Sequence, residues 1–210
     1  MIIASASHQV KEYRYEKSQI AKQERNAQLV KNIVEVTKPL LLQQGYEDLT
    51  IREICANAGI TTGMFYRHFV SKDDVLSFCY MQELEVLLVS IDEKLEGLPL
   101  PDQLVMLHTE VLKINSRFGP ASVYMFLNRK TESTSGSWQM RDMLKAKNTE
   151  LIEKAVAEGF ALSPGRDPDN IYYDISTISK GCMADWYMTG FEDIADHAKN
   201  ILSRLMPYLL

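Results

Sequence analysis

Three hydrogen-bond donors of different chemistry cluster in the N-terminal third of this sequence. Tyr66, His68 and Lys72 offer a phenol, an imidazole and an ammonium group within one short stretch. Such groups bind phosphate oxygens and the edges of bases. Phe65 and Phe69 are four residues apart, which places both rings on one face of a helix. A buried helical hairpin would explain the phenylalanines but not the donors on the other side, so the pattern favours nucleic-acid recognition.

The residues around these donors predict two short helices joined by a tight turn. Thr50 is expected to cap the first helix, with Glu53 closing a capping box. Gly59 is expected to end that helix in a left-handed conformation, and the hydroxyl of Thr61 to cap the next one. Residues 50–76 therefore predict a helix-turn-helix, whose second helix enters the major groove of DNA.

The same stretch resembles the tetracycline-repressor (TetR) family of transcriptional regulators over residues 25–76. The most specific part is a Tyr-x-His-Phe-x-Ser-Lys run that follows Ala-Gly-Ile-Thr-Thr-Gly. The matching residues are Gly45, Tyr46, Thr50, Ile54, Ala58, Gly59, Ile60, Phe65, Tyr66, Arg67, His68, Phe69, Ser71 and Lys72. The resemblance implies an all-α fold of about nine helices. A three-helix DNA-binding unit would precede a C-terminal helical bundle for dimerisation and ligand binding.

The resemblance also implies which residues contact DNA. Thr62, Gly63 and Tyr66 are expected to face the base edges, and Gly63 would let the backbone approach them closely. His68 and Lys72 are expected to bind phosphate. The full set of candidate DNA-binding residues is Arg52, Thr61, Thr62, Gly63, Met64, Tyr66, Arg67, His68 and Lys72.

Two positions depart from the family pattern. Met64 stands where the family usually has a small hydroxyl residue, and Ile51 stands where a threonine is frequent. Each departure removes one hydrogen bond to phosphate. We therefore expect a modest affinity for DNA, or a preference for a thymine methyl group.

The rest of the sequence is helical in pattern, without strands, internal repeats or low-complexity runs. Residues 25–44 predict the first helix, in which Pro39 removes a backbone donor and is expected to cause a kink. Residues 1–24 predict either an arm that contacts DNA or a solvated extension of the first helix, and their nearly balanced charge favours the extension. The expected organisation is an extension at 1–24, a DNA-binding domain at 25–72 and a ligand-binding and dimerisation domain at 73–210.

One long helix, predicted at residues 73–95, is expected to link the two parts mechanically. Ser71 can cap it, with Asp74 at the reciprocal position. A helix from Pro101 to Phe118 follows, and the further predicted helices span residues 121–129, 138–158, 168–189 and 192–210.

Polar and aromatic residues are scattered through the apolar helices of residues 101–190. For any single residue, filling of the core is the simpler explanation. As a set they predict a mainly apolar small-molecule pocket, which the resemblance also implies. The candidate pocket residues are His108, Asn115, Tyr124, Asn128, Trp138, Met143, Tyr172, Met183 and Trp186.

The last two predicted helices carry apolar residues on more than one face, together with small residues that permit close approach. One face is expected to pack inward and another against a second copy of the chain, which would form a four-helix bundle. The candidate dimer residues are Ile178, Cys182, Ile194, Ala198, Ile201 and Leu205.

Charge is uneven along the chain, whose net charge is -5. Residues 1–72 hold ten Lys and Arg against seven Asp and Glu, whereas the remainder holds 13 against 21. A mildly basic end on an acidic body suggests that one end faces phosphate. Ordinary surface variation would also produce so small an excess.

Other chemistries find no support in the sequence. The three cysteines are far apart in apolar stretches, which predicts reduced thiols in a cytosol. Neither paired histidines nor a phosphate-binding glycine loop nor a Ser-His-Asp set is present, so we expect no metal, no cofactor and no enzymatic activity. The N-terminus is too quickly polar for a signal peptide, and no apolar run approaches the ~20 residues of a membrane span. A cytoplasmic protein is expected.

These features predict a ligand-responsive transcriptional repressor. It would bind a near-palindromic operator DNA as a homodimer and be released by a small-molecule effector. One alternative is a DNA-binding regulator controlled by a protein partner without a small-molecule effector, which a core without a cavity would favour. Another is an enzyme that has kept a vestigial helix-turn-helix, which a cleft with strongly shifted carboxylates would favour.

Overall fold

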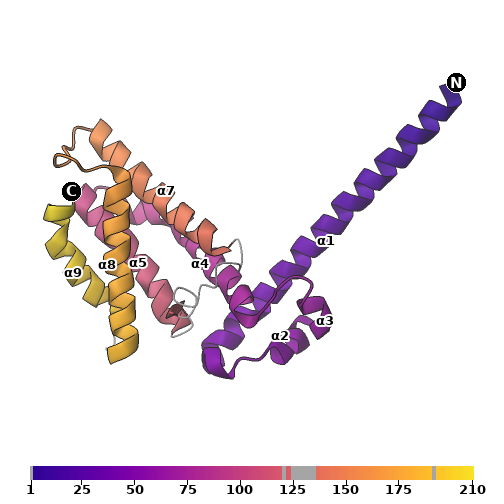
Figure 1. Cartoon of the computed structure of the whole chain (residues 1–210), viewed down its shortest axis with the longest axis horizontal. Helices are drawn as coiled ribbons and strands as arrows, with labels where there is room; N and C mark the ends of the chain where they lie inside the picture. Colours follow the sequence, from indigo (N-terminus) through magenta and orange to yellow (C-terminus); the bar gives the residue numbers. More distant parts are fainter. Residues whose placement is uncertain (1, 120–121, 124–135, 191–192) are drawn as a thin grey trace.

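The structure, a computed structural model, describes the backbone of residues 2–119, 122–123, 136–190 and 193–210, with side chains except those of 2–16 and 136–138. These residues form helices and, in the described ranges, no strand. The all-α prediction is confirmed (Figure 1). Most of the short helix predicted at 121–129 lies outside the described residues.

Helix α1 spans Ile2–Asp48, so it begins well before the predicted start at Arg25. It therefore includes the segment for which we favoured a helical extension. Gly45 leaves the helical conformation with a φ of 80°, as expected, and it is the residue with non-helical angles inside α1. The backbone stays helical through Pro39, where a kink was predicted. The N-terminal half of α1 projects away from the rest of the molecule (Figure 1).

Two short helices follow α1 and form the helix-turn-helix. Helix α2 spans Ile51–Ala58 and helix α3 spans Thr62–Phe65, and the long helix α4 begins after them at Lys72. Helix α2 packs against both α1 and α3.

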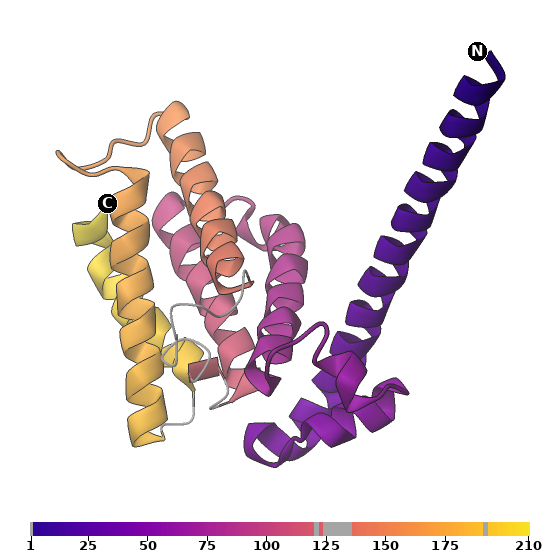
Figure 2. The same ribbon diagram turned by 45° about the vertical axis from the view of Figure 1, so that its right-hand side comes forward.

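The C-terminal body consists of α4 (Lys72–Leu95), α5 (Leu100–Phe118), α7 (Gly136–Ala157), α8 (Pro168–Thr189) and α9 (Ile194–Leu209). Helix α5 runs through the middle of the body and packs against α4, α7, α8 and α9. In Figure 2, α8 and α9 lie on the side of the body far from α1.

The helix-turn-helix and the body share one hydrophobic core. The main buried cluster contains Ile33 of α1, Phe65 of α3, Leu84 of α4, Leu104 of α5 and Ile171 of α8. Helix α4 joins the two parts because it packs against α1 on one side and against α5 and α7 on the other. A displacement of α4 would therefore change the packing of both the helix-turn-helix and the body.

Candidate nucleic-acid interface and ligand cavity

The turn that the sequence predicts forms with its expected caps. The Glu53 amide donates to Thr50 Oγ1 at 3.2 Å, and the Thr50 amide donates to Glu53 Oε2 at 2.9 Å. Hydrogen bonds from Thr50 hold the pKa of the Glu53 carboxyl below its usual value. Gly59 ends α2 with a φ of 66°, and Thr61 Oγ1 accepts from the Met64 amide at 3.2 Å. Local groups thus fix both ends of the turn.

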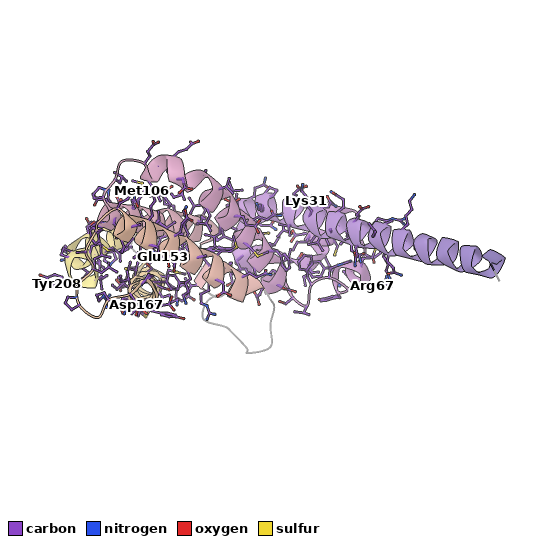
Figure 3. All side chains as sticks on the ribbon, turned by 90° about the horizontal axis from the view of Figure 1, so that it is seen from above. Lys31, Arg67, Met106, Glu153, Asp167 and Tyr208 are labelled. Atoms are coloured by element: carbon purple, nitrogen blue, oxygen red, sulfur yellow. The ribbon has the colours of Figure 1, made fainter. Side chains whose placement is uncertain are left out.

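Two phenylalanines decide which face of the second helix is exposed. Phe65 and Phe69 are 0% and 1% exposed, and their ring centroids are 5.4 Å apart. Their burial turns most of the candidate DNA-binding residues toward solvent. The exposed candidates are Arg52, Thr61, Thr62, Gly63, Met64, Tyr66 and Arg67, and His68 is partly exposed. In Figure 3, Arg67 and Tyr208 of α9 lie toward opposite ends of the molecule.

Gly63 is not required by the fold around it. A Cβ atom at this position would approach nothing closer than Thr61 Oγ1, at 3.8 Å, and the backbone is not in the left-handed region. An alanine would fit and would favour a helix. A constraint on Gly63 would therefore have to come from a molecule outside the chain.

Lys72, a predicted phosphate ligand, is directed into the protein. Its Nζ donates to the carbonyl oxygens of Tyr46 at 2.5 Å and Leu49 at 2.9 Å. It also lies 4.0 Å from the centroid of the Tyr46 ring. These contacts hold the turn between α1 and α2. An ammonium group has three donors, so two protein contacts leave one donor for a phosphate.

The start of α4 differs from the predicted capping arrangement in one detail. Ser71 Oγ accepts from the Asp74 amide at 3.2 Å, as expected, but Asp74 Oδ2 accepts from the Val70 amide at 3.0 Å rather than from Ser71. Asp74 is only 5% exposed, and Oδ1 has no hydrogen-bond partner. Burial raises the pKa of this carboxyl.

A cavity of about 250 Å³ lies in the body between α4, α5, α7 and α8. Its walls are mainly apolar and come from all four helices. The lining residues are Tyr80, Leu84, His108, Val111, Leu112, Asn115, Val123, Met140, Arg141, Leu144, Tyr172, Ser176, Ser179, Lys180, Met183 and Ala184.

The cavity includes part of the predicted pocket set. His108, Asn115, Tyr172 and Met183 line it. Met143 and Trp186 are not among the lining residues, and Trp186 packs on a second buried cluster that includes residues of α5, α8 and α9. Tyr124, Asn128 and the side chain of Trp138 lie outside the described residues.

A buried polar network crosses three helices at the cavity. His108 Nε2 lies 3.1 Å from Asn148 Oδ1, and His108 Nδ1 lies 3.4 Å from Ser179 Oγ. Asn148 Nδ2 donates to the Leu144 carbonyl at 2.8 Å, so its Oδ1 is the acceptor and His108 carries its proton on Nε2. Burial lowers the pKa of His108 to about 4, so the ring is neutral at pH 7.

Five lining residues that carry polar groups were not in the predicted pocket set: Tyr80, Arg141, Ser176, Ser179 and Lys180. Tyr80 follows the helical spacing of the apolar residues in the long helix, and Ser179 is one of several small residues in α8. The available signal was the polar Ser-x-x-Ser-Lys run at 176–180. Only the packing of α8 against α5 turns that run toward the cavity.

Three charged residues connect α1 to α4 and α5 of the body next to the cavity. Glu83 of α4 accepts from Lys38 of α1 at 3.1 Å and from Arg117 of α5 at 3.2 Å. Tyr80 and Leu84, on either side of it in α4, line the cavity. A single turn of α4 thus touches the cavity, α1 and α5.

Half of the candidate dimer residues are already covered within one chain. Cys182, Ile194 and Ala198 are 4%, 0% and 0% exposed and form the buried cluster between α8 and α9. They have no free surface for a second chain, so the predicted set is corrected at these positions. Hydrophobic periodicity identified their faces but not which neighbour covers them. Ile178 and Ile201 are half-buried, and Leu205 is 36% exposed.

Another stripe on α8 and α9 is partly or fully exposed instead. On α8 it contains the exposed Thr177, Gly181 and Met188 and the half-buried Ala184, which share one helical face. On α9 it contains the half-buried Ile201 and the exposed Leu205 and Tyr208. Met188 is 75% exposed and Tyr208 is 81% exposed.

The structure also describes the cysteines, the possible metal ligands and the length of apolar helices. Cys55, Cys79 and Cys182 are free and buried. Among the described residues, no group of three or more His, Cys, Asp or Glu side chains is arranged to hold a metal ion. No helix in the described part of the chain has the length and apolar character needed to cross a membrane.

Comparison with known proteins finds a similarity over the helix-turn-helix. Residues 33–77 match the family model described as bacterial regulatory proteins, tetR family. The Transposon Tn10 TetC protein of Escherichia coli is 40% identical over 53 residues, which is 25% of this chain and 27% of that protein. The chain thus matches this curated relative over about a quarter of its length.

Solved structures resemble most of the chain. A TetR-family transcriptional regulator from Syntrophomonas wolfei aligns with a TM-score of 0.60 and 21% identity, over 88% of this chain and 98% of the other. The regulator FadR from Bacillus subtilis, solved in complex with stearoyl-CoA, aligns with a TM-score of 0.61 and 14% identity, over 85% of this chain and 98% of the other. At these identities the likeness establishes the fold.

Proposed function

We propose that this chain, whose N-terminal segment belongs to the TetR family of bacterial regulatory proteins, is a DNA-binding transcriptional repressor that a small molecule releases from its operator. The observation that carries the proposal is the position of α4. This helix begins in the helix-turn-helix at Lys72 and lines the cavity with Tyr80 and Leu84. One rigid element therefore connects a surface suited to DNA with a cavity suited to a ligand.

Gly63 provides the sharpest test of DNA recognition. The fold tolerates a side chain there, so Gly63→Ala should fold at least as stably as the wild-type protein. If the backbone of α3 approaches base edges, the added methyl group should weaken operator binding at least about tenfold, or about 1.4 kcal/mol. Fluorescence anisotropy on a genomic fragment selected by the purified protein would measure it. Unchanged affinity would remove Gly63 from the interface.

Base readout is assigned to Thr62 and Tyr66, and phosphate binding to His68 and the third donor of Lys72. Substitutions at Thr62 and Tyr66 should change the sequence motif recovered by binding-site selection. Lys72→Ala should weaken binding to all sequences alike and flatten the slope of log K against log salt by roughly 1. Because Lys72 also holds the carbonyls of Tyr46 and Leu49, Lys72→Arg and the melting temperature serve as controls for misfolding.

The exposed stripe on α8 and α9 is the proposed dimer face. A stable twofold dimer of this kind often buries ~2,000 Å² or more, and the small residues Gly181 and Ala184 would let two α8 helices approach closely. Leu205→Asp should yield monomers in light scattering at micromolar concentration. Val89→Asp, at an 85% exposed apolar position on α4, is the matched control and should stay dimeric. A wild-type monomer would contradict the proposal.

Release by a ligand requires that cavity and operator be coupled. A coupling of ~1–3 kcal/mol lowers operator affinity about 5–150-fold, and linkage is reciprocal, so operator DNA must weaken ligand binding by the same factor. Titrating a bound ligand with and without operator is the direct measurement. Equal affinities would leave a DNA-binding dimer with an uncoupled cavity.

The two alternatives fit the geometry less well. A regulator controlled by a protein partner alone gains no support from a body with a cavity between four helices. The enzyme alternative needs shifted carboxylates in a cleft, and among the described residues no Asp or Glu lines the cavity.

A further inference from the structure

A stripe of residues runs along one face of α1, from the helix-turn-helix into the projecting half of the helix. Ser18, Lys22, Arg25, Leu29 and Asn32 follow one another at steps of four and three residues, so they share one helical face. These five residues are named the α1 stripe. What the stripe contacts differs between its two ends.

The C-terminal end of the α1 stripe faces the helix-turn-helix. Asn32 Nδ2 donates to the carbonyl oxygen of Ala58 at 3.1 Å, and Ala58 is the last residue of α2, immediately before the turn at Gly59. Leu29 is half-buried and packs against the main hydrophobic cluster. The stripe therefore lies on the side of α1 that carries the turn into α3, where Thr62 is a proposed base contact.

The N-terminal end of the α1 stripe extends past the helix-turn-helix. Ser18, Lys22 and Arg25 are exposed, and α1 continues well beyond Arg67 in Figure 3. At a rise of 1.5 Å per residue, Arg25 lies about 10 Å beyond Asn32 along the helix axis, and Ser18 lies about 21 Å beyond it. This part of the stripe is accessible to a partner.

The helix separates charges that are nearly balanced along the sequence. The same steps of three and four residues continue from Ser18 to Arg14 and Lys11, and no acidic residue occupies any position of this series. Neither Lys22 nor Arg25 has an acidic residue three or four positions away, which is the spacing of an ion pair along a helix. The balance of charge that favoured a merely solvated extension therefore does not hold on this face.

We propose that the α1 stripe binds the phosphate backbone of the operator beside the bases that α3 reads. Lys22 and Arg25 each contact a phosphate, and the Ser18 hydroxyl donates to another. These side chains are among those that bind phosphate in protein–DNA complexes, and duplex DNA presents one negative charge per about 1.7 Å of its length. This inference rests on the proposed function, because it needs operator DNA seated on α3.

The stripe adds affinity without adding sequence preference, since phosphate oxygens carry no base identity. Its contacts compensate for Ile51 and Met64, the two positions of the helix-turn-helix at which a hydrogen bond to phosphate is missing. The helix-turn-helix thus selects the site, and the α1 stripe strengthens binding to it.

The first test removes the two cations of the stripe. Lys22→Gln/Arg25→Gln should weaken operator binding at least about tenfold and flatten the slope of log K against log salt by about 1.8 per bound chain, for two lost phosphate contacts. Binding-site selection should return the wild-type motif. Lys31→Gln is the control, because Lys31 is exposed on the same helix but lies off the stripe and pairs with Glu35 at 3.8 Å. It should leave affinity and slope unchanged.

The second test adds one negative charge at two neighbouring positions. Ser18→Glu places it on the stripe, and Gln19→Glu places it on an equally exposed position rotated by about 100° around the helix. Both variants have the same net charge, so a difference in operator affinity reports the face of α1. Ser18→Glu should bind operator at least about tenfold more weakly than Gln19→Glu. Glutamate and glutamine are good helix formers, and circular dichroism checks that α1 stays helical in every variant.

Two results would overturn the inference. One is an equal salt slope for the wild-type protein and Lys22→Gln/Arg25→Gln, and the other is an equal affinity for the two glutamate variants. Operator binding by the wild-type protein would keep the proposed function in both cases, whereas a wild-type protein that binds no DNA refutes both. Binding to phosphatidylserine vesicles that depends on Lys22 and Arg25, without an effect on DNA, would assign the stripe to a membrane surface and also contradict the inference.

Discussion

The helix-turn-helix and the cavity satisfy their polar groups in opposite ways. In the helix-turn-helix, Thr61 and Ser71 accept hydrogen bonds from backbone amides three residues away, near the surface. At the cavity, His108 bonds to Asn148 and Ser179, which are 40 and 71 residues away, and all three are buried. A cap forms as soon as its helix forms, whereas the network needs α5, α7 and α8 in place together.

This difference determines where a single substitution lowers the free energy of unfolding most. Loss of a surface cap returns a backbone amide to water, which costs about 1 kcal/mol. Loss of one member of a buried network leaves the others desolvated and without partners. Asp74 is an exception within the helix-turn-helix, because its Oδ1 is buried without a partner.

The largest effect is expected from breaking the buried network. His108→Leu leaves Asn148 Oδ1 and Ser179 Oγ without their partner and should lower the free energy of unfolding by about 3 kcal/mol. Thr109→Val is the matched control, since Thr109 is next to it in α5 and is also buried, but it bonds locally to the Val105 carbonyl. Urea unfolding should give a loss below about 1 kcal/mol for the control. Equal losses of unfolding free energy in His108→Leu and Thr109→Val would contradict the difference between the buried network and a local hydrogen bond.

The next effect is a dependence on pH. The folded-state pKa of His108 is about 4, below its ordinary value of 6.5, so the unfolded chain binds the extra proton as pH falls through this range. Stability is therefore full above pH 6.5 and should fall by about 2 kcal/mol between pH 6.5 and 5. His108→Leu should lack this loss when both proteins are unfolded in urea across the same range. The same slope in both would assign the acid sensitivity to other groups.

A smaller effect is expected at a local cap. Ser71→Ala removes the acceptor of the Asp74 amide at the start of α4 and should cost about 1 kcal/mol. Ser90→Ala is its control, because Ser90 lies in the interior of α4 and bonds back to the Val86 carbonyl, where alanine is the better helix former. Thermal unfolding of both variants gives the difference. A loss above about 3 kcal/mol at Ser71 would show that the cap supports distant contacts.

The smallest expected effect has the opposite sign. Asn115→Leu replaces a buried amide, whose Oδ1 lacks a well-formed hydrogen bond, by an apolar side chain, so the protein without ligand should be unchanged or more stable by up to about 1 kcal/mol. Urea unfolding of the ligand-free protein measures it. A loss above about 1 kcal/mol would mean that Asn115 supports the fold, for example through its hydrogen bond with the Tyr80 hydroxyl.

The same contrast explains how far the sequence could be interpreted. Thr50, Gly59 and Thr61 cap their helices as predicted, because capping depends on residues a few positions apart. A solvated extension of the first helix was the favoured interpretation of residues 1–24, but the first helix itself was predicted to begin at Arg25, because the N-terminal segment has no apolar stripe. These features belong to single elements.

The cavity depends on how elements pack, which periodicity does not specify. His108, Asn115, Tyr172 and Met183 lie on it, but Arg141 and Lys180 could not be assigned to it before the orientation of α7 and α8 was known. Ile194 and Ala198 illustrate the same limit, because an apolar face looks alike whether its own chain or a second chain covers it.

The continuity of α4 sets a geometric scale for regulation. Leu84, on the cavity wall, lies twelve residues after Lys72 along one unbroken helix, which is about 18 Å. A tilt of about 10° pivoting at the cavity would move the start of α4 by about 3 Å, close to the 3.4 Å step between base pairs on one strand. In the proposed dimer, each recognition helix would move by that step. A ligand would then move the two recognition helices out of register with the major grooves without changing any side chain that contacts DNA.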